Sequence, residues 1–339
     1  MKAAVIPEIN GVWELRDVPT PTAEPGQVLI KVHACGICYT DVWTTRGAAG
    51  DLFPLITGHE VVGEVVEVGA GVHSRQVGDR VGTTWVQSTC GRCAYCRQNL
   101  PLSGQAAMNC AGPARLTGFT AQGGHAEYIA VTATGTVLIP DALSFELAAP
   151  IFCAGYTTWS GLRAAEPAPH ERVAIVGIGG LGHLALQFAA ASGLETIAVT
   201  HSPDKQELAR TLGAHEVFAT GEELLAAGGA DVMLLCSNSY DQGADALAGL
   251  RHDGRVVSMG LDPNADFVIP TDRNRPFFAQ RQKVIGSTHN GLRYLAEALD
   301  FAAAGKVTPM IETFPKEEVS SAVAKVAEGT VRFRAVVTY

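Results

Sequence analysis

Four cysteines lie close together in the sequence and could bind a metal ion. Cys90, Cys93 and Cys96 are separated by two residues each, and thirteen residues separate Cys96 from Cys110. Four thiolates provide the closed tetrahedral ligand set of a structural zinc site. A redox-active CxxC pair is the alternative, but it belongs to a thioredoxin-like context that this sequence lacks. We therefore predict a structural zinc lobe over about residues 88–112.

A second set of metal-binding residue types is dispersed along the chain. It comprises Cys38, the adjacent pair His59 and Glu60, and Cys153. Two thiolates and one imidazole would make a catalytic zinc site with one open position for a water molecule or a substrate oxygen. Spacing alone leaves a second interpretation open, in which the cysteines are small buried hydrophobic residues and His59 is structural.

A glycine-rich segment has the pattern of a dinucleotide-binding loop. Gly177, Gly179 and Gly182 form a GxGxxG motif after a predicted strand at 172–176 and before a predicted helix at 181–192. The three glycines would permit a tight turn, the approach of a pyrophosphate and close helix packing. Gly180 and Leu181 complete the loop, whose N–H groups could hold phosphate oxygens. A glycine-rich turn in some other α/β protein is the alternative.

The residues after the next predicted strand bear on the choice between NAD and NADP. Thr200 occupies the position where a carboxylate would bind the ribose 2′-hydroxyl of NAD, and Asp204 is expected to begin a helix. Hydroxyl groups and positive charge nearby suit a 2′-phosphate and come from Thr200, His201, Ser202 and Lys205. NADP(H) is therefore favoured. NAD(H) stays open, because Thr200 could merely cap the strand while His201 and Lys205 are solvated.

The elements that position these residues fall into two groups. Short strands are predicted at 28–32, 61–68, 127–131 and 136–139, followed by a helix that begins after Ser144. From residue 172 onward strands and helices alternate, with strands at 172–176, 196–200, 232–236 and 255–259 and helices at 181–192 and 203–212. This alternation predicts a parallel, doubly wound sheet. The tail is predicted as a strand at 284–286, a helix at 292–304, an extended segment at 307–312, a helix at 316–328 and a strand at 334–338.

Composition limits the function classes. The chain has 339 residues, 47% of them hydrophobic, and a net charge of −9, so about two domains with sizeable cores are expected and nucleic acid is an unsuitable partner. Pro7 and Glu8 interrupt the only apolar stretch near the N-terminus, and no apolar run is long enough to cross a bilayer. We expect no membrane association and a cytoplasmic location, where the eight cysteines favour metal binding over disulfides.

Seven motifs occur in order: GICYTD, ITGHEVVGEV, VGDRV, CGRCAYC, GGHAEYI, FCAG and VGIGGLGHLALQFA. Together they resemble the zinc-containing medium-chain dehydrogenase/reductase family, near its alcohol dehydrogenases. The resemblance implies an α/β protein with a β-rich, chaperonin-10-like catalytic domain (1–147 and 286–339) and a doubly wound parallel-sheet (Rossmann) cofactor domain (148–285). It also implies two zinc ions per chain and a homodimer or homotetramer.

The resemblance assigns roles to the residues of the dispersed set. It implies that Cys38, His59 and Cys153 bind the catalytic zinc, and that Cys35 does not. Glu60 matches an acid that can approach the metal, Asp41 a carboxylate that orients His59, and Thr40 a hydroxyl that contacts the substrate oxygen and starts a proton relay. Zinc would activate the oxygen of an alcohol or aldehyde while hydride passes to or from the nicotinamide.

The sequence departs from the family pattern in two places. Trp43 stands where many relatives have a relay histidine, so the proton must leave by another route. The thirteen residues between Cys96 and Cys110 exceed the usual spacing, which indicates an insertion in the lobe or an incomplete site. Near the C-terminus, Arg334 resembles an arginine that approaches the cofactor pyrophosphate, with Arg332 as the alternative.

Aromatic residues suggest an apolar substrate pocket. Trp85 matches a family pocket position, and Tyr39 and Trp43 flank the zinc cysteine. Phe119 is a weaker candidate, for which core packing is favoured. The sequence therefore predicts a primary alcohol or aldehyde as substrate. The alternatives are a zinc polyol or secondary-alcohol dehydrogenase using NAD, a zinc-free quinone or enoyl reductase, and a non-enzymatic nucleotide- and metal-binding redox sensor.

Overall fold

The computed structural model describes residues 1–339 except 49, 51, 99–101, 261, 263 and 270–273. The described residues form two compact units. Unit 1 comprises Met1–Cys153, His289–Ala304 and Pro309–Tyr339, and unit 2 comprises Ala154–Thr288 and Gly305–Thr308. The domain boundaries predicted at 147/148 and 285/286 each lie a few residues before these divisions.

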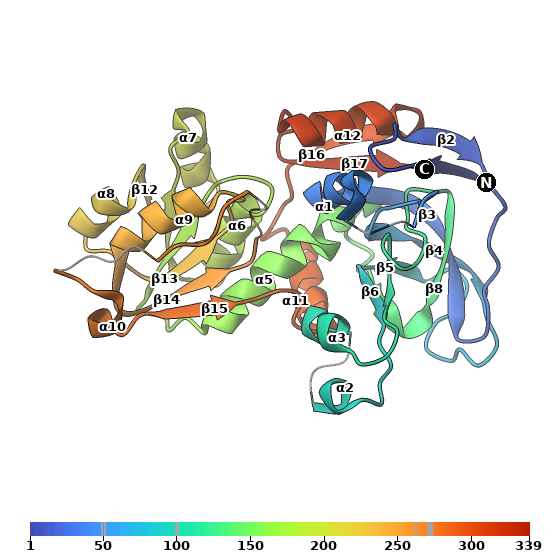
Figure 1. Ribbon diagram of the computed structural model, residues 1–339, viewed down its shortest axis with the longest axis horizontal. Coiled ribbons are helices and arrows are strands. Elements are labelled where there is room, and N and C mark those ends of the chain that lie inside the picture. The colour runs from blue at the N-terminus through green and yellow to red at the C-terminus, as the bar shows by residue number, and fades with distance from the viewer. Residues whose placement is uncertain (49, 51, 99–101, 261, 263, 270–273) are drawn as a thin grey trace. The chain divides into compact units, whose positions relative to one another are not determined.

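Unit 1 is built around an antiparallel-rich sheet. Its strands run in the order β16 (Ile311–Pro315), β17 (Arg334–Thr338), β3 (Gln27–Ile37), β4 (Glu60–Val68), β5 (Arg80–Thr83) and β9 (Thr136–Leu138), and β8 (Tyr128–Thr132) also pairs with β3. Because β17 pairs antiparallel with β3, the C-terminal segment joins the sheet of the N-terminal part (Figure 1). Valine and isoleucine side chains of β3, β4 and β8 form a buried core here.

The remaining elements of unit 1 are short. The additional strands are β1 (Lys2–Val5), β2 (Glu14–Asp17), β6 (Val86–Ser88) and β7 (Arg115–Leu116). The helical elements are α1 (Tyr39–Trp43), η1 (Thr44–Ala48), α2 (Ala94–Gln98), α3 (Gly104–Asn109), η2 (Ala133–Gly135), α4 (Phe145–Ala148), η3 (Ala149–Phe152), α11 (Leu292–Ala303), η5 (Lys316–Glu318) and α12 (Val319–Glu328). The predicted N-cap is confirmed, because the Ser144 side chain accepts the Leu147 N–H of α4.

The prediction of an extended segment at 307–312 is mostly wrong. The strand in this region, β16, begins only at Ile311 and continues to Pro315. Pro309 has no N–H to donate to a neighbouring strand, so pairing starts after it.

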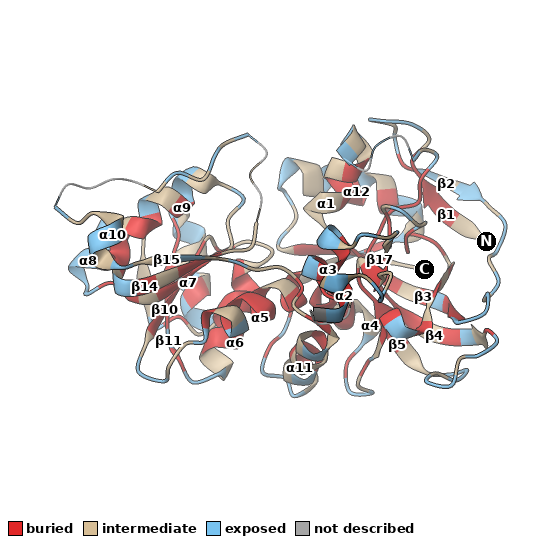
Figure 2. Ribbon diagram, turned by 60° about the horizontal axis from the view of Figure 1, so that its bottom comes forward, coloured by how far each residue is buried: buried red, intermediate tan, exposed pale blue. Residues whose placement is uncertain are grey.

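Unit 2 is a six-stranded sheet in which all neighbouring pairs are parallel. The strand order is β12 (Glu216–Phe218), β11 (Glu195–Val199), β10 (Arg172–Val176), β13 (Ala230–Leu235), β14 (Leu250–Ser258) and β15 (Lys283–Gly286). Its helices are α5 (Ala154–Ala165), α6 (Gly182–Ala191), α7 (Pro203–Thr211), α8 (Gly221–Ala226), α9 (Tyr240–Ala246), η4 (Leu247–Gly249) and α10 (Phe277–Gln280). Figure 2 shows the inner strands largely buried.

Both faces of the parallel sheet are covered. On one face Ile197 and Met233 pack with Leu224 of α8 and Ala246 of α9. Helices α5 and α6 pack together through Trp159 and Phe188, whose ring centroids are 5.4 Å apart. The predicted doubly wound sheet is therefore confirmed. Among the described residues, no helix combines the length and apolar character needed to span a membrane.

Candidate functional site

Cys38 lies at the junction between β3 and α1. It is the N-cap of α1, and its extended backbone (φ −98°, ψ 156°) ends the strand. Its N–H donates to Asp41 Oδ2 at 2.8 Å, which fixes the first turn of α1. This turn brings the Cys38 thiol to 3.3 Å from Thr40 Oγ1. The strand end therefore presents a sulfur and a hydroxyl together.

The neighbouring strand β4 begins with Glu60, and His59 directly precedes it. Glu60 pairs with Gly36 in the β3–β4 register. A Cβ atom on Gly36 would lie 1.9 Å from Glu60 Oε2, so only glycine leaves room for this buried carboxylate. Cys153 follows η3, where the backbone leaves the helical conformation (φ −127°, ψ −74°). Three separate segments of unit 1 thus meet at one point.

The structure brings the dispersed set together. Cys38, His59, Glu60 and Cys153 each offer a ligand atom, and all four atoms lie within 4.8 Å of one another. The sulfur atoms of Cys38 and Cys153 are 3.9 Å apart. Cys35 lies outside this group, and its buried thiol is 3.9 Å from His125 Nε2. All eight cysteines are free thiols.

The charges in the cluster fit a divalent cation. The thiol of Cys153, hydrogen-bonded to Cys38, lowers the Cys38 pKa well below its usual range, while the same contact and burial raise the Cys153 pKa well above it. Cys38 is therefore the more readily ionised of the two, and a cation held between the sulfur atoms would favour the thiolate form of both. Burial raises the pKa of Glu60 to about 7, and its Oε2 has no hydrogen-bond partner among the described groups. Sulfur and imidazole donors in this number suit Zn²⁺.

Asp41 lies beside the histidine of this cluster. Its buried carboxylate accepts hydrogen bonds from Thr57 Oγ1 at 2.6 Å, from the Gly58 N–H at 3.0 Å and from the Cys38 N–H. Its Oδ1 lies 3.8 Å from His59 Nδ1. This distance is too long for a hydrogen bond, and His59 Nδ1 has no hydrogen-bond partner among the described groups, so the orienting role of Asp41 stays a prediction.

Arg334 lies in the same buried region. Its guanidinium forms an ion pair with Glu60, and both side chains are almost completely buried. The charge of Arg334 opposes the effect of burial on the Glu60 pKa. A contact between Arg334 and the cofactor pyrophosphate stays a prediction. Arg332 lies apart from this pair, and its N–H donates to Glu312.

The four-cysteine lobe forms a second cluster. The ligand atoms of Cys90, Cys93, Cys96 and Cys110 also lie within 4.8 Å of one another. The Cys90 N–H points at Cys110 Sγ at 3.3 Å. N–H groups of Arg92 and Cys93 lower the pKa of Cys90 to about 6, which favours a thiolate. The long spacing before Cys110 is accommodated by α3, whose C-cap is Cys110.

The glycine-rich loop has the geometry that its pattern predicts. Gly177 has a φ of +85° and ends β10 in a turn that other residues rarely adopt. A Cβ atom on Gly182 would lie 1.9 Å from the Gly177 carbonyl oxygen. A Cβ atom on Gly179 would meet nothing within 4 Å. Gly182 is thus required by packing, whereas Gly179 borders open space that a pyrophosphate could occupy.

The residues expected to select the cofactor lie between β11 and α7. Thr200 is buried and its Oγ1 accepts the Ser202 N–H at 3.3 Å, so it holds the turn. Ser202 is the N-cap of α7, and Asp204 lies in its first turn as predicted. His201 is exposed, and Ser202 and Lys205 are half-buried. The three accessible side chains carry hydroxyl and basic groups.

The aromatic residues that were predicted to line the substrate pocket form two separate pairs. Tyr39 and Trp43 meet edge to face at 5.5 Å, and Tyr39 also packs against a core cluster with Val319. Trp85 lies 6.4 Å from Phe119, whose ring is 6.1 Å from that of His59. Phe119 is only half-buried, which disagrees with the core packing favoured from the sequence.

A histidine that the sequence did not single out contacts this second pair. Trp85 Nε1 donates to His289 Nδ1 at 2.9 Å. Burial lowers the pKa of His289 to about 3, so its ring is neutral. A single histidine outside any motif has no pattern in the sequence that would predict its place in the site.

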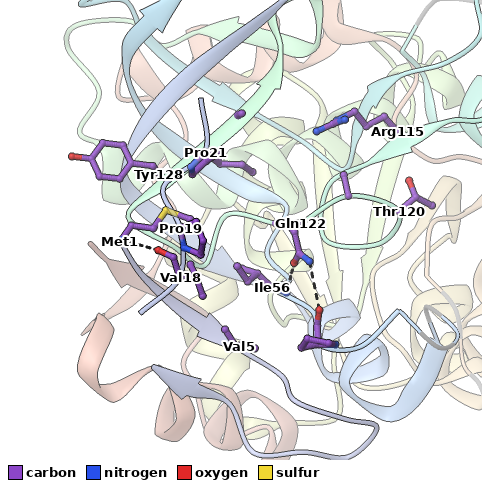
Figure 3. Close-up of a pocket in the computed structure, with 15 residues that line it drawn as sticks. Met1, Val5, Val18, Pro19, Pro21, Ile56, Arg115, Thr120, Gln122 and Tyr128 are labelled. Carbon is purple, nitrogen blue, oxygen red and sulfur yellow. Dashed lines mark hydrogen bonds between the residues drawn. The ribbon is translucent and has the colours of Figure 1, made fainter. Parts of the chain in front are cut away.

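A separate cavity of about 450 Å³ lies elsewhere in unit 1 (Figure 3). Its lining includes Val5, Val18, Ile56 and Tyr128, and Gln122 braces one side through a 2.6 Å hydrogen bond from the Ile56 N–H. Its lining includes no member of either cysteine cluster.

Comparison with known proteins agrees with this geometry. The family "Alcohol dehydrogenase GroES-like domain" matches residues 24–141, and "Zinc-binding dehydrogenase" matches residues 180–304. An alcohol dehydrogenase of Geobacillus stearothermophilus is 40% identical over 347 aligned positions, which cover 99% of this chain and 98% of the relative. The chain belongs to the zinc-containing medium-chain alcohol dehydrogenase family. It is an NAD(P)-dependent alcohol dehydrogenase.

Two further relatives extend the comparison. An NADP-dependent alcohol dehydrogenase C 1 of Mycolicibacterium smegmatis is 34% identical and covers 92% of this chain and 90% of its own. The crystal structure of an alcohol dehydrogenase from Aeropyrum pernix superposes with a TM-score of 0.86, at 27% identity and 100% coverage of both chains. The predicted family and fold class are therefore confirmed.

Proposed function

We propose that this enzyme interconverts primary alcohols and aldehydes with NADP(H), at a zinc ion held by Cys38, His59 and Cys153. The observation that carries this proposal is the convergence of four buried or half-buried donor atoms within 4.8 Å, supplied by three separate segments. Two thiolates and one imidazole leave a position open, which distinguishes a catalytic site from the closed four-cysteine lobe.

The residues around the proposed metal position would each have a different role in the reaction. A zinc ion bound there supplies Lewis-acid activation of the substrate oxygen. The Thr40 hydroxyl, beside Cys38, would pass the substrate proton onward, and Asp41 would hold the His59 ring. Glu60 can carry or release a proton near neutral pH and would approach the metal, while Arg334 balances its charge.

The proposed preference for NADP(H) rests on the turn before α7. His201, Ser202 and Lys205 are accessible and could bind a 2′-phosphate through hydroxyl and basic groups. Thr200 would support the turn rather than contact the phosphate. The Mycolicibacterium smegmatis relative carries the description NADP-dependent, which favours the same cofactor. The glycine loop, including Gly180 and Leu181, would bind the pyrophosphate, with Arg334 as a further contact.

A primary alcohol or aldehyde fits the aromatic surroundings of the cluster. Trp85 and Phe119 extend from the His59 ring as a largely apolar surface, which favours alkyl and aryl substituents over polyols. Tyr39 and Trp43 stay candidates for a second side of the pocket.

One assay tests substrate and cofactor together. A panel of primary alcohols, secondary alcohols, polyols and aldehydes is measured with NADPH/NADP⁺ and with NADH/NAD⁺. We expect the highest kcat/KM for primary alcohols and aldehydes with the phosphorylated cofactor. A clear preference for NAD(H) would refute the assignment of His201, Ser202 and Lys205, and a preference for polyols would refute the apolar pocket.

We also propose a second, structural zinc in the four-cysteine lobe and a homodimer or homotetramer. Among the described residues β15 is the last strand of its sheet and carries the exposed Val284, and such a sheet edge is suited to association. Light scattering coupled to size exclusion tests the oligomer, and a monomer would contradict it. A cytoplasmic location stays a prediction.

A further inference from the structure

His289 lies between β15 and α11, and its buried ring contacts three fixed groups. Nδ1 lies 2.9 Å from Trp85 Nε1 and 3.2 Å from Thr84 Oγ1. On the other side of the ring, Nε2 lies 3.2 Å from the carbonyl oxygen of Cys153. The ring therefore bridges a pocket indole and a residue of the metal-binding cluster.

The chemistry of these partners fixes the tautomer of His289. An indole N–H can only donate, so Nδ1 must accept. The hydrogen is then on Nε2, where it donates to the Cys153 carbonyl, which can only accept. One neutral tautomer satisfies both contacts, and rotating the ring by half a turn would break both.

The backbone of His289 is fixed as well. Its carbonyl oxygen accepts the Gly104 N–H at 2.7 Å. Gly104 begins α3, and Ser103 caps this helix through its side chain. The ring is thus held on a backbone anchored to the four-cysteine lobe, and it can serve as a rigid support for the indole.

We propose that His289 is a positioning residue that fixes the Trp85 indole relative to Cys153 and thereby sets substrate specificity. This inference rests on the proposed function, in which Trp85 and Phe119 line the alcohol site. A fixed indole in edge-to-face contact with Phe119, whose ring lies 6.1 Å from that of His59, would fix the shape of the apolar surface beside the metal position. It favours unbranched and aryl primary alcohols over alcohols branched beside the carbinol carbon.

The test compares variants of His289 and Trp85 with a matched control. His289→Leu removes the ring contacts with Trp85, Thr84 and Cys153, whereas His289→Asn keeps an acceptor near the Nδ1 position. Trp85→Phe removes the indole donor. His252→Leu changes a histidine whose side chain is 81% exposed and serves as the control.

The first readout is independent of activity. The ¹⁵N-labelled protein has four tryptophans and gives four indole N–H signals, and Trp85→Phe identifies that of Trp85. We expect His289→Leu to shift this signal upfield, as a lost hydrogen bond requires, while His289→Asn and His252→Leu leave it near its original position. An unmoved signal in His289→Leu would show that the indole is not held by His289.

The second readout is the ratio of kcat/KM for an unbranched over a branched primary alcohol. We expect His289→Leu to lower this ratio about tenfold, the scale of discrimination that pocket packing supplies. In the Trp85→Phe background the same substitution should leave the ratio nearly unchanged. Equal ratios in wild type and His289→Leu, with full zinc content in both, would overturn the proposal and leave His289 a structural residue.

Two further outcomes are decisive. If His289→Leu does not fold, His289→Gln replaces it, because the longer amide reaches the Cys153 carbonyl but cannot offer an acceptor at the Nδ1 position. It is then expected to give the same shift and the same loss of discrimination. A wild-type protein that oxidises no alcohol would refute the proposed function and the specificity role together, whereas a shifted indole signal with an unchanged ratio refutes only the role of His289.

Discussion

At the scale of single residues, the pair of Glu60 and Arg334 determines the charge beside the metal position. Both side chains are buried, and a buried charge that loses its partner is strongly destabilising. Gly36 provides the space for the carboxylate. The three residues come from strands β3, β4 and β17, so the pair also joins the C-terminal strand to the N-terminal sheet.

Arg334→Met should therefore destabilise the fold. We expect the free energy of unfolding to fall by about 3 kcal/mol. The loss should grow as pH rises above neutrality, because Glu60, with a pKa already raised to about 7, then has to be buried as an unpaired anion. Denaturant unfolding at pH 6 and pH 9 measures both effects. Glu60→Gln/Arg334→Met should recover part of the loss, and equal stability of wild type and Arg334→Met would show that the ion pair with Glu60 does not stabilise the fold.

The buried His125 is expected to make the stability of the fold depend on pH in the acidic range. Burial lowers its pKa from 6.5 to about 4. Because the unfolded chain binds a proton more readily, this group supports stability above about pH 6.5, and that support is lost as pH falls through 4. Thermal unfolding across this range should show a shallower decline for His125→Gln than for wild type. The exposed His252→Gln should not alter the slope, and identical slopes for His125→Gln and wild type would exclude His125 as a cause.

At the scale of elements, two glycines of the loop between β10 and α6 are expected to differ in role, one in packing and the other in cofactor binding. Gly182→Ala places a Cβ atom 1.9 Å from the Gly177 carbonyl oxygen, so we expect a loss of about 1–3 kcal/mol of stability. Gly179→Ala meets open space and should fold normally, but its methyl group should weaken cofactor binding about tenfold, or 1.4 kcal/mol. Thermal unfolding and cofactor titration of both variants distinguish the two. Normal cofactor affinity in Gly179→Ala would place the pyrophosphate elsewhere.

The four-cysteine lobe should hold its own metal ion. Elemental analysis is expected to find two zinc ions per chain in the wild type, one for each cluster of donors. Cys110→Ala should retain one and lower thermal stability, since Cys110 also ends α3. Because α3 is hydrogen-bonded to His289, the Trp85 indole signal should broaden or shift in this variant. One zinc ion in both proteins would show that the lobe carries none.

At the scale of the whole molecule, the fold was largely predictable because hydrophobic periodicity and glycine motifs are local. Strand β10 and the GxGxxG loop occur at the predicted residues, as does the final strand β17. The contacts that shape the site are not local. Glu60 and Arg334 are 274 residues apart in sequence, and Trp85 and His289 are 204 apart. A single arginine or histidine has no sequence pattern that would predict a partner so distant in the chain. The core packing of Tyr39 and the partial exposure of Phe119 likewise depend on tertiary contacts.

Replacement of His59 tests whether alcohol oxidation depends on a zinc ion held by Cys38, His59 and Cys153. His59→Ala removes one ligand of the proposed catalytic zinc while leaving the glycine loop of unit 2 unchanged. Alcohol oxidation and cofactor affinity are measured on the same preparation, with folding confirmed by circular dichroism. We expect the rate of alcohol oxidation to fall to background while the cofactor still binds with an unchanged Kd. Full alcohol oxidation by His59→Ala would contradict a zinc-dependent mechanism at Cys38, His59 and Cys153.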